Sequence, residues 1–376
     1  MIVCMPPHVA DVSLTALGVL WPAMLAQEVS EVSAAIARGL ITIVDGGEHA
    51  EPRSEPGWVT PNDIILELES VRLRRFGQPR NKRPVLIVAP FALHAATLAD
   101  LARGHSLIEV LQSSTEGAVY ISDWRSANRD RASRGIDDYL ADLNVLVDEV
   151  GGTVDLVGLC QGGWMGLAYA ARFPRKIGKL VLAGAPIDIA AQQTVLSRVA
   201  RTTPISVFRE MVALGQGVMS GRWLFQFWQP QSLDIEVIRS TLQIEDSIAP
   251  EVLEHLQARF RDWYEWTLDL PGRFYLETVE RIYLNNELAA GTFIALGRRI
   301  DLTCIRVPIF LLAACNDQVV APAQTLAVRH LVGTSPGAIH CAVSLCEHLG
   351  LFMGSRTLAN EWHDVGCWLR EPATIP

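Results

Sequence analysis

The chain has 376 residues, of which 49% are hydrophobic and 19% charged, and its net charge is −9. A chain this rich in apolar residues is expected to fold, and its acidity, without any run of Lys or Arg, argues against nucleic acid as a partner. The apolar content predicts surface that a partner, a lipid-like substrate or an inserted cap must cover.

The seven cysteines form no C-x-x-C pair, and their odd number predicts free thiols in a reducing compartment. Residues 12–26 are apolar, but no basic segment precedes them and Pro22 interrupts them, so we expect a helix and not a signal peptide. Without an apolar run long enough to span a membrane, the expected location is the cytoplasm.

Residues 1–57 are expected to form an N-terminal appendage, with helical spacing over 23–39. Alternating apolar residues then predict strands over 64–76. Short apolar runs typical of buried parallel strands follow at 84–90, 118–124, 154–159, 179–184, 307–314 and 342–345. Helices are expected between them, at 98–111, 135–150, 162–172 and 323–332. This alternation predicts an α/β fold with a mainly parallel, doubly wound sheet.

The alternation stops between residues 190 and 300, where aromatic side chains cluster. We therefore expect a mostly helical cap over 190–300, inserted into a sheet domain made of 58–189 and 301–376. The aromatic side chains either form the core of this cap or line an apolar substrate pocket. The candidates for the pocket are Trp223, Phe227 and Trp228.

The segment 158–162, Gly-Leu-Cys-Gln-Gly, follows a predicted strand and opens a predicted helix. It has the G-x-S-x-G arrangement of the α/β-hydrolase nucleophile turn, with Cys160 in place of Ser. The turn is sharp and strained, so Gly158 and Gly162 remove side chains that would collide there, and Gly163 extends the clearance. The alternative is that Cys160 merely fills the end of a strand, but the strand, the glycines and the helix all stand where a nucleophile requires them.

A cysteine at a helix N-terminus is activated because the free N–H groups stabilise its thiolate. The backbone N–H of Gln161 is the expected donor to a developing oxyanion. A second donor is expected in the loop after the 84–90 strand, at Phe91 or Ala92.

In this fold the acid and the base follow the nucleophile in that order. Asp317 directly follows the 307–314 strand and is the candidate acid, and His348, near the end of the chain, is the candidate base. His340 is the main rival, because it is expected just before the last strand. A metal site of Cys341, Cys346 and His348 is an alternative whose spacing matches no usual pattern, so no metal or other cofactor is expected.

The segment 158–163 resembles the G-x-C-x-G-G box of the polyhydroxyalkanoate synthases, and the chain is most similar to the short-form synthases, which work with a second subunit. The similarity extends from about residue 60 to residue 369. Outside the box it rests on 60–63, 99–107, 121–124, 137–140, 283–291, 316–317 and 348–352. The resemblance implies Cys160, Asp317 and His348 as the triad. It also implies a hydroxyacyl-CoA substrate, association with polyester granules, and a second subunit or a homodimer.

Intracellular polyhydroxyalkanoate depolymerases are similar too, through 89–98, 184–188 and 352–356, but they lack the double glycine. The chain departs from both families at Glu347, where a Gly is usual before the base. The expected function is therefore acyl transfer from hydroxyacyl-CoA to a growing polyester. Hydrolysis of the polyester or of a thioester is the second hypothesis, and a non-catalytic partner subunit is the third.

Overall fold

The computed structural model describes residues 54–80, 82–228 and 234–372, without the side chains of 226–228. The appendage predicted over 1–57 lies almost wholly outside these residues. The described residues 54–225 and those from 234 onward belong to one compact unit. None of the described helices has both the length and the hydropathy needed to cross a membrane.

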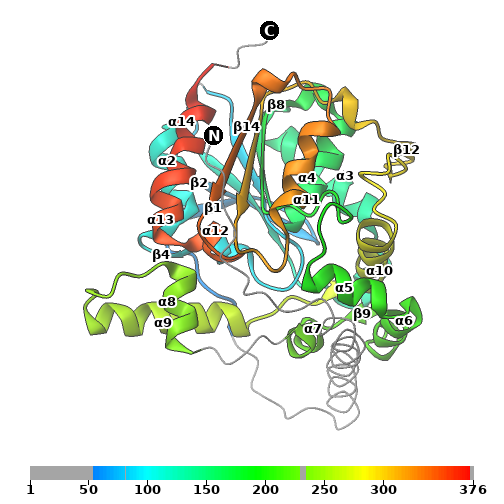
Figure 1. Ribbon diagram of the computed structural model, residues 1–376, viewed down its shortest axis with the longest axis horizontal. Coiled ribbons are helices and arrows are strands. Elements are labelled where there is room, and N and C mark those ends of the chain that lie inside the picture. Colours follow the sequence, from blue (N-terminus) through cyan, green and yellow to red (C-terminus); the bar gives the residue numbers. More distant parts are fainter. Residues whose placement is uncertain (1–53, 81, 229–233, 373–376) are drawn as a thin grey trace, which may run out of the picture. The chain divides into compact units, whose positions relative to one another are not determined.

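An eight-stranded sheet forms the centre of this unit, in the order β1-β2-β6-β3-β7-β8-β13-β14 (Figure 1). The pairs from β6 through β14 are parallel, and β1 and β2 are antiparallel to their neighbours. The strands are β1 (Asn62–Glu67), β2 (Val71–Phe76), β3 (Val85–Val88), β6 (Val119–Trp124), β7 (Val154–Leu159), β8 (Ile177–Ala183), β13 (Ile309–Ala314) and β14 (Ile339–Ser344). The predicted mainly parallel sheet is confirmed.

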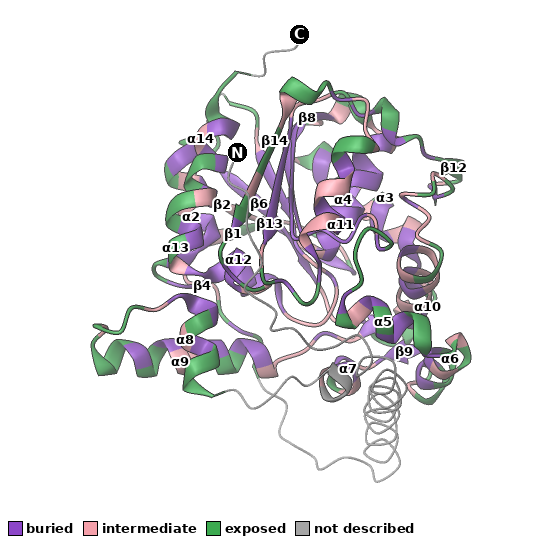
Figure 2. Ribbon diagram, in the orientation of Figure 1, coloured by how far each residue is buried: buried purple, intermediate pink, exposed green. Residues whose placement is uncertain are grey.

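Helices cover both faces of the sheet, as the alternation predicted. Figure 1 shows α2 (Leu107–Thr115), α13 (Ser355–Thr357) and α14 (His363–Arg370) on one face. The other face carries α3 (Ile136–Glu149), α4 (Gln161–Arg172) and α11 (Pro322–Leu326). With both faces covered, the central strands are buried at nearly every position (Figure 2), which explains why their sequences are continuous apolar runs.

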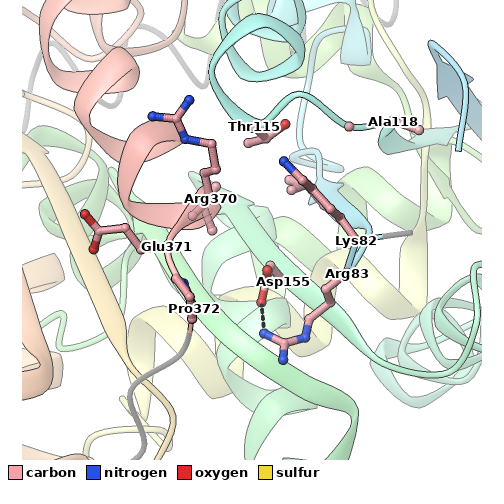
Figure 3. A pocket seen from close by; sticks show the side chains of 11 residues that line it. Lys82, Arg83, Thr115, Ala118, Asp155, Arg370, Glu371 and Pro372 are labelled. Atoms are coloured by element: carbon pink, nitrogen blue, oxygen red, sulfur yellow. Dashed lines mark hydrogen bonds and ion pairs between the residues drawn. The ribbon is translucent and has the colours of Figure 1, made fainter. Parts of the chain in front are cut away.

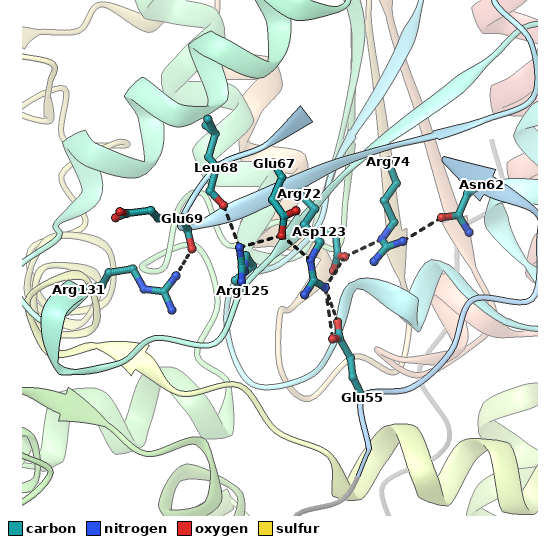
Figure 4. A network of polar contacts seen from close by, with 10 residues as sticks. All are labelled: Glu55, Asn62, Glu67, Leu68, Glu69, Arg72, Arg74, Asp123, Arg125 and Arg131. Atoms are coloured by element: carbon teal, nitrogen blue, oxygen red, sulfur yellow. Dashed lines mark hydrogen bonds and ion pairs between the residues drawn. The ribbon is translucent and has the colours of Figure 1, made fainter. Parts of the chain in front are cut away.

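The antiparallel edge is held by a network of charged side chains (Figure 4). Asp123 of β6 is buried and accepts a hydrogen bond from Arg74 Nε at 2.7 Å. Burial raises the pKa of Asp123, and the charge of Arg74 partly offsets this rise. Arg72 lies between Asp123 and Glu67, at 3.5 and 3.6 Å. The network fastens the β1–β2 hairpin to the parallel part of the sheet.

Between β8 and β13 the chain is mostly helical, as the loss of alternation predicted. It forms α5 (Val195–Thr202), α6 (Ile205–Leu214), α7 (Gly221–Trp228), α8 (Ile235–Leu242), α9 (Pro250–Glu265), α10 (Gly272–Glu277) and the π-helix η4 (Thr278–Leu284). Short strand pairs β9 (Val218–Met219) with β10 (Leu270–Pro271), and β11 (Ile294–Ala295) with β12 (Arg298–Arg299), complete it. The cap boundaries at 190 and 300 stay a prediction.

The insertion packs on the loop that follows β3. The His94 ring lies 4.6 Å from the Trp263 ring and 5.0 Å from the Tyr264 ring, both on α9. The Leu268 N–H donates to the Leu93 carbonyl at 2.8 Å. Ring packing and a backbone hydrogen bond therefore fix the helical insertion to the loop that is expected to hold the second oxyanion donor.

The helix predicted over 98–111 is wrong in its first half. There the chain forms a 3₁₀ turn η1 (Ala96–Ala99) and a hairpin of β4 (Asp100–Ala102) and β5 (His105–Ser106), before α2 begins at Leu107. Buried Asp100 accepts hydrogen bonds from Thr60 Oγ1 at 2.7 Å and from Ser106 Oγ at 2.6 Å. These bonds, one of them to a residue distant in sequence, override the local helical spacing.

Two predicted boundaries near the C-terminus also shift. The helix expected over 323–332 is α11 followed by a 3₁₀ turn η6 (Ala327–His330). The last strand, β14, starts at Ile339 and not at 342, so His340 lies within the strand. Its ring stacks on Phe310 at 6.0 Å and contacts Trp368 at 5.8 Å, which gives it a packing role.

Candidate active site

Cys160 occupies the sharp turn between β7 and α4. Its backbone has φ 48° and ψ −118°, a conformation that costs a non-glycine residue free energy and recurs at functional sites. The turn is held by two backbone hydrogen bonds, from Cys160 N–H to the Ala183 carbonyl and from Gly163 N–H to the Cys160 carbonyl, each 2.8 Å. The neighbouring strand β8 thus fixes where the thiol stands.

The three glycines of the turn are required by packing. A Cβ on Gly158 would lie 2.5 Å from Gly163 Cα, and one on Gly163 would lie 2.4 Å from Ala185 Cβ. A Cβ on Gly162 would meet the Val88 carbonyl oxygen at 2.0 Å, so this glycine clears the end of β3. The start of α4 is thereby pressed against two strand ends.

The structure brings Cys160, His348 and Asp317 together in one hydrogen-bonded chain. His348 Nε2 lies 3.2 Å from Cys160 Sγ, and His348 Nδ1 lies 2.6 Å from Asp317 Oδ2. The other carboxylate oxygen, Asp317 Oδ1, accepts the N–H groups of Val319 and Val320 at 2.8 Å each. Because β13 and β14 are parallel neighbours, the loops after them present the acid and the base at the same edge as Cys160.

The charges around His348 favour its protonated form. Burial opposes protonation, but the charges of Asp317 and Cys160, with their hydrogen bonds, outweigh it and hold the pKa of His348 well above its ordinary value. An imidazolium beside Cys160 is the environment that makes a cysteine reactive.

The predicted oxyanion donors belong to the start of α4 and to the loop after β3. Gln161 is the first residue of α4, where backbone N–H groups have no acceptor within the helix. The Phe91 side chain is buried in the core, its ring 4.9 Å from that of Tyr139, so only its backbone could serve the site. The start of this loop is held where Ser122 Oγ accepts the Ala89 N–H at 3.0 Å. The donor roles of Gln161, Phe91 and Ala92 stay a prediction.

The predicted pocket aromatics are only partly described. Trp223 lies half-buried on α7, whereas the side chains of Phe227 and Trp228, at the end of that helix, lie outside the described residues. Another aromatic residue, Tyr283, lies on the π-helix that follows α10. After its burial, the negative charges of Cys160 and Asp317 both contribute to raising the pKa of its hydroxyl. The sequence placed Tyr283 among the cap aromatics but offered no way to single it out.

Glu347 is exposed and borders a cavity of about 310 Å³ behind the acid and base loops. The cavity is lined by Asn316, Leu345, Cys346, Arg356 and the end of α8. The charges that raise the pKa of His348 are those of Asp317 and Cys160. Glu347 is not among the charges that raise the pKa of His348.

A second cavity, of about 220 Å³, lies at the amino ends of β3 and β7 (Figure 3). Arg83 and Asp155 form an ion pair in it at 2.9 Å. In parallel α/β sheets the chemistry sits at the carboxyl ends of the strands, so this cavity is not the candidate site. The described residues contain no group of three or more His, Cys, Asp or Glu that could hold a metal ion.

Two solved structures, of a lipase and of an epoxide hydrolase, share this architecture. A monoacylglycerol lipase of Paleococcus ferrophilus matches with a TM-score of 0.52 and 16% identity, over 80% of this chain and 98% of the lipase. An epoxide hydrolase of Bacillus megaterium matches with a TM-score of 0.50 and 12% identity, over 80% of this chain and 98% of the epoxide hydrolase. These similarities establish the α/β-hydrolase fold.

The sequence relatives are more specific. A poly(3-hydroxyalkanoate) polymerase subunit PhaC of Synechocystis is 29% identical over 83% of this chain and 85% of its own length. The PhaC subunit of Allochromatium vinosum is 24% identical over 93% of this chain and 98% of its own length. The chain is a distant homologue of PhaC. Residues 240–362 also match a family model described as the C-terminus of PHB de-polymerase. The matched residues extend from the second half of the insertion through β13 and β14.

Proposed function

We propose that this PhaC homologue is a cysteine-dependent acyltransferase that moves hydroxyacyl groups from a CoA thioester to a growing polyester. The observation that carries the proposal is the chain of hydrogen bonds from Cys160 Sγ through His348 to Asp317, with the sulfur at the N-terminus of α4. The distant homology to PhaC subunits over most of the chain supplies the substrate class.

In the first half-reaction His348 Nε2 takes the thiol proton, and Cys160 Sγ attacks the thioester carbonyl carbon. Asp317 holds the ring through Nδ1 and stabilises the imidazolium. The backbone N–H of Gln161 donates to the oxyanion. When the carbon–sulfur bond to CoA breaks, the CoA thiolate leaves with the proton from His348, and the acyl group stays on Cys160.

In the second half-reaction a hydroxyl group attacks the acyl-enzyme. His348 takes the proton of this hydroxyl, the new ester bond forms, and the Cys160 sulfur leaves and recovers the proton. If water replaces the hydroxyl, the same steps release a free acid. The accessibility of the acyl-enzyme to water therefore decides between polymer synthesis and hydrolysis.

Hydrolysis of the polyester, or of a thioester, by the same triad is the second candidate function. It is favoured by the match of residues 240–362 to the depolymerase C-terminal model. This match covers α9, α10 and β13 and reaches past His348, so it includes both the proposed acid and the proposed base.

Two substrates separate the candidates. We expect the protein to release CoA from 3-hydroxybutyryl-CoA and to form polymer, and to release little monomer from amorphous polyester. The measurements are thiol release, polymer mass and free 3-hydroxybutyrate. The Cys160→Ala variant is the control for both substrates.

The outcomes have distinct meanings. Monomer release from polyester without polymer growth would establish the depolymerase instead. No activity on either substrate, with or without an added PhaC-type partner subunit, would favour a non-catalytic subunit.

We further propose that the active form is a homodimer or a complex with a second subunit, at the surface of polyester granules in the cytoplasm. Co-sedimentation with granules tests this location.

A further inference from the structure

Tyr283 lies on η4, the π-helix that directly follows α10. Such helices are rare and occur frequently at functional sites, because the wider turn shifts the side chains that follow it. Tyr283 is the sixth of the seven residues from Thr278 to Leu284 and is half-buried. Its position is therefore set by an unusual stretch of backbone.

The segment after Tyr283 is fastened to the loop that follows β8. Asn286 has a left-handed backbone, with φ 49°. Its side chain donates to Asp188 Oδ1 at 2.7 Å and accepts the Ile189 N–H at 3.0 Å. Arg281 reinforces the segment by donating to Glu287 Oε2 at 3.0 Å. Tyr283 thus stands between two tethers, one on each side along the chain.

The loop after β8 is itself a wall of the candidate site. A Cβ on Gly184 would lie 3.4 Å from His348 Cε1, and Ala185 packs against Gly163. The Thr325 hydroxyl of α11 holds the Ala185 carbonyl at 2.9 Å. Because Asn286 is bonded to this loop, η4 is brought to the same wall of the site.

The charges of Cys160 and Asp317 act on the Tyr283 hydroxyl, in agreement with the tether that brings η4 to this wall of the site. Burial raises its pKa most, and the charges of Cys160, Tyr275 and Asp317 add to the rise. The phenol therefore stays neutral at physiological pH, so it can both donate and accept a hydrogen bond. A neutral hydroxyl in a partly desolvated site suits a neutral polar group on the substrate.

We propose that the Tyr283 hydroxyl, held by the Asn286–Asp188 bridge, binds the free hydroxyl of the hydroxyacyl group and so selects hydroxylated acyl chains. This inference rests on the proposed acyl transfer and adds its specificity determinant. Recognition involves a hydrogen bond only, and Tyr283 exchanges no proton in the covalent steps.

The test compares two activated esters that differ by one hydroxyl, p-nitrophenyl 3-hydroxybutyrate and p-nitrophenyl butyrate. Release of p-nitrophenol reports acylation of Cys160 whether or not CoA thioesters are accepted. For Tyr283→Phe, the ratio of kcat/KM for the hydroxylated ester to that for the plain ester should fall about tenfold, the size expected for one neutral hydrogen bond. Asn286→Ala should lower the same ratio, since it releases the tether.

Tyr275→Phe is the matched control, because Tyr275 is a half-buried tyrosine on the neighbouring helix whose raised pKa results from desolvation alone. An unchanged ratio in Tyr283→Phe, or an equal loss for both esters, would overturn the inference. Wild-type protein that cleaves both esters but releases no CoA from 3-hydroxybutyryl-CoA would instead refute the proposed acyl transfer, and the ratio would still judge Tyr283.

Discussion

At the scale of single residues, Cys160 combines a strained backbone with a hydrogen bond to an imidazole whose pKa is raised. Replacing it with Ala should lower acylation by roughly 10³-fold or more, since the nucleophile is lost. Cys160→Ser should also lose most activity, because a hydroxyl is far less acidic than a thiol. The measurements are CoA release and the thermal midpoint. Substantial activity in a folded Cys160→Ala protein would remove the proposed nucleophile.

The same environment predicts selective alkylation. Iodoacetamide should modify Cys160 faster than the other cysteines, because the His348 imidazolium favours the reactive thiolate. Burial raises the pKa of the Cys346 thiol and slows its reaction. His348→Ala should slow the modification of Cys160 specifically, as followed by peptide mass spectrometry. Equal rates at all sites would count against an activated thiolate.

At the scale of elements, the uncharged His94 ring links the loop after β3 to helix α9. Burial lowers its pKa to about 4, although its hydrogen bond to the Trp266 carbonyl opposes this shift. An unfolded chain takes up the proton near pH 6.5. Between about pH 6.5 and about pH 4 the unfolded chain therefore binds a proton that folded His94 does not. The free energy of unfolding is highest above about pH 6.5 and falls by up to roughly 1.4 kcal/mol for each pH unit below it.

We therefore expect a lower pH to weaken the contact between the loop after β3 and helix α9. His94→Phe keeps an aromatic ring and removes the titration, so its thermal midpoint should fall less than that of the wild type between pH 7.5 and pH 5. Buried His105, whose pKa is also lowered by burial, leaves a residual dependence in both proteins. His255→Gln, on the exposed face of α9, is the control and should behave as the wild type does.

At the scale of the whole molecule, the insertion between β8 and β13 is expected to decide how water reaches the acyl-enzyme. Closing a site expels water, and a dry site favours transfer to a bound hydroxyl. Trp223→Ala on α7 should therefore raise the ratio of free acid to polymer formed from 3-hydroxybutyryl-CoA several-fold. The matched control is Glu347→Gly, which restores the usual residue before the base and leaves the insertion intact. If only the total rate changes, the partition is set elsewhere.

Much of the fold and the nucleophile turn follows from local sequence. Buried parallel strands need continuous apolar runs, and the turn around Cys160 needs glycines at 158, 162 and 163, so both leave short patterns in the chain. Asp317 and His348 were predictable because each follows a strand in the chain order of this fold, and the parallel sheet brings those strand ends to one edge.

What remained depended on contacts between distant segments. The bonds of Asp100 to Thr60 turned half of a predicted helix into a hairpin. The same tertiary packing selected Tyr283 from many aromatic residues, because Asn286 bonds to the loop after β8. It also left Glu347 exposed. The sequence by itself therefore determined the sheet and the three candidate residues that the structure brings together, because their patterns are local. Only the tertiary structure decided what surrounds the triad, because helical insertions are positioned by side-chain contacts that no short-range periodicity encodes.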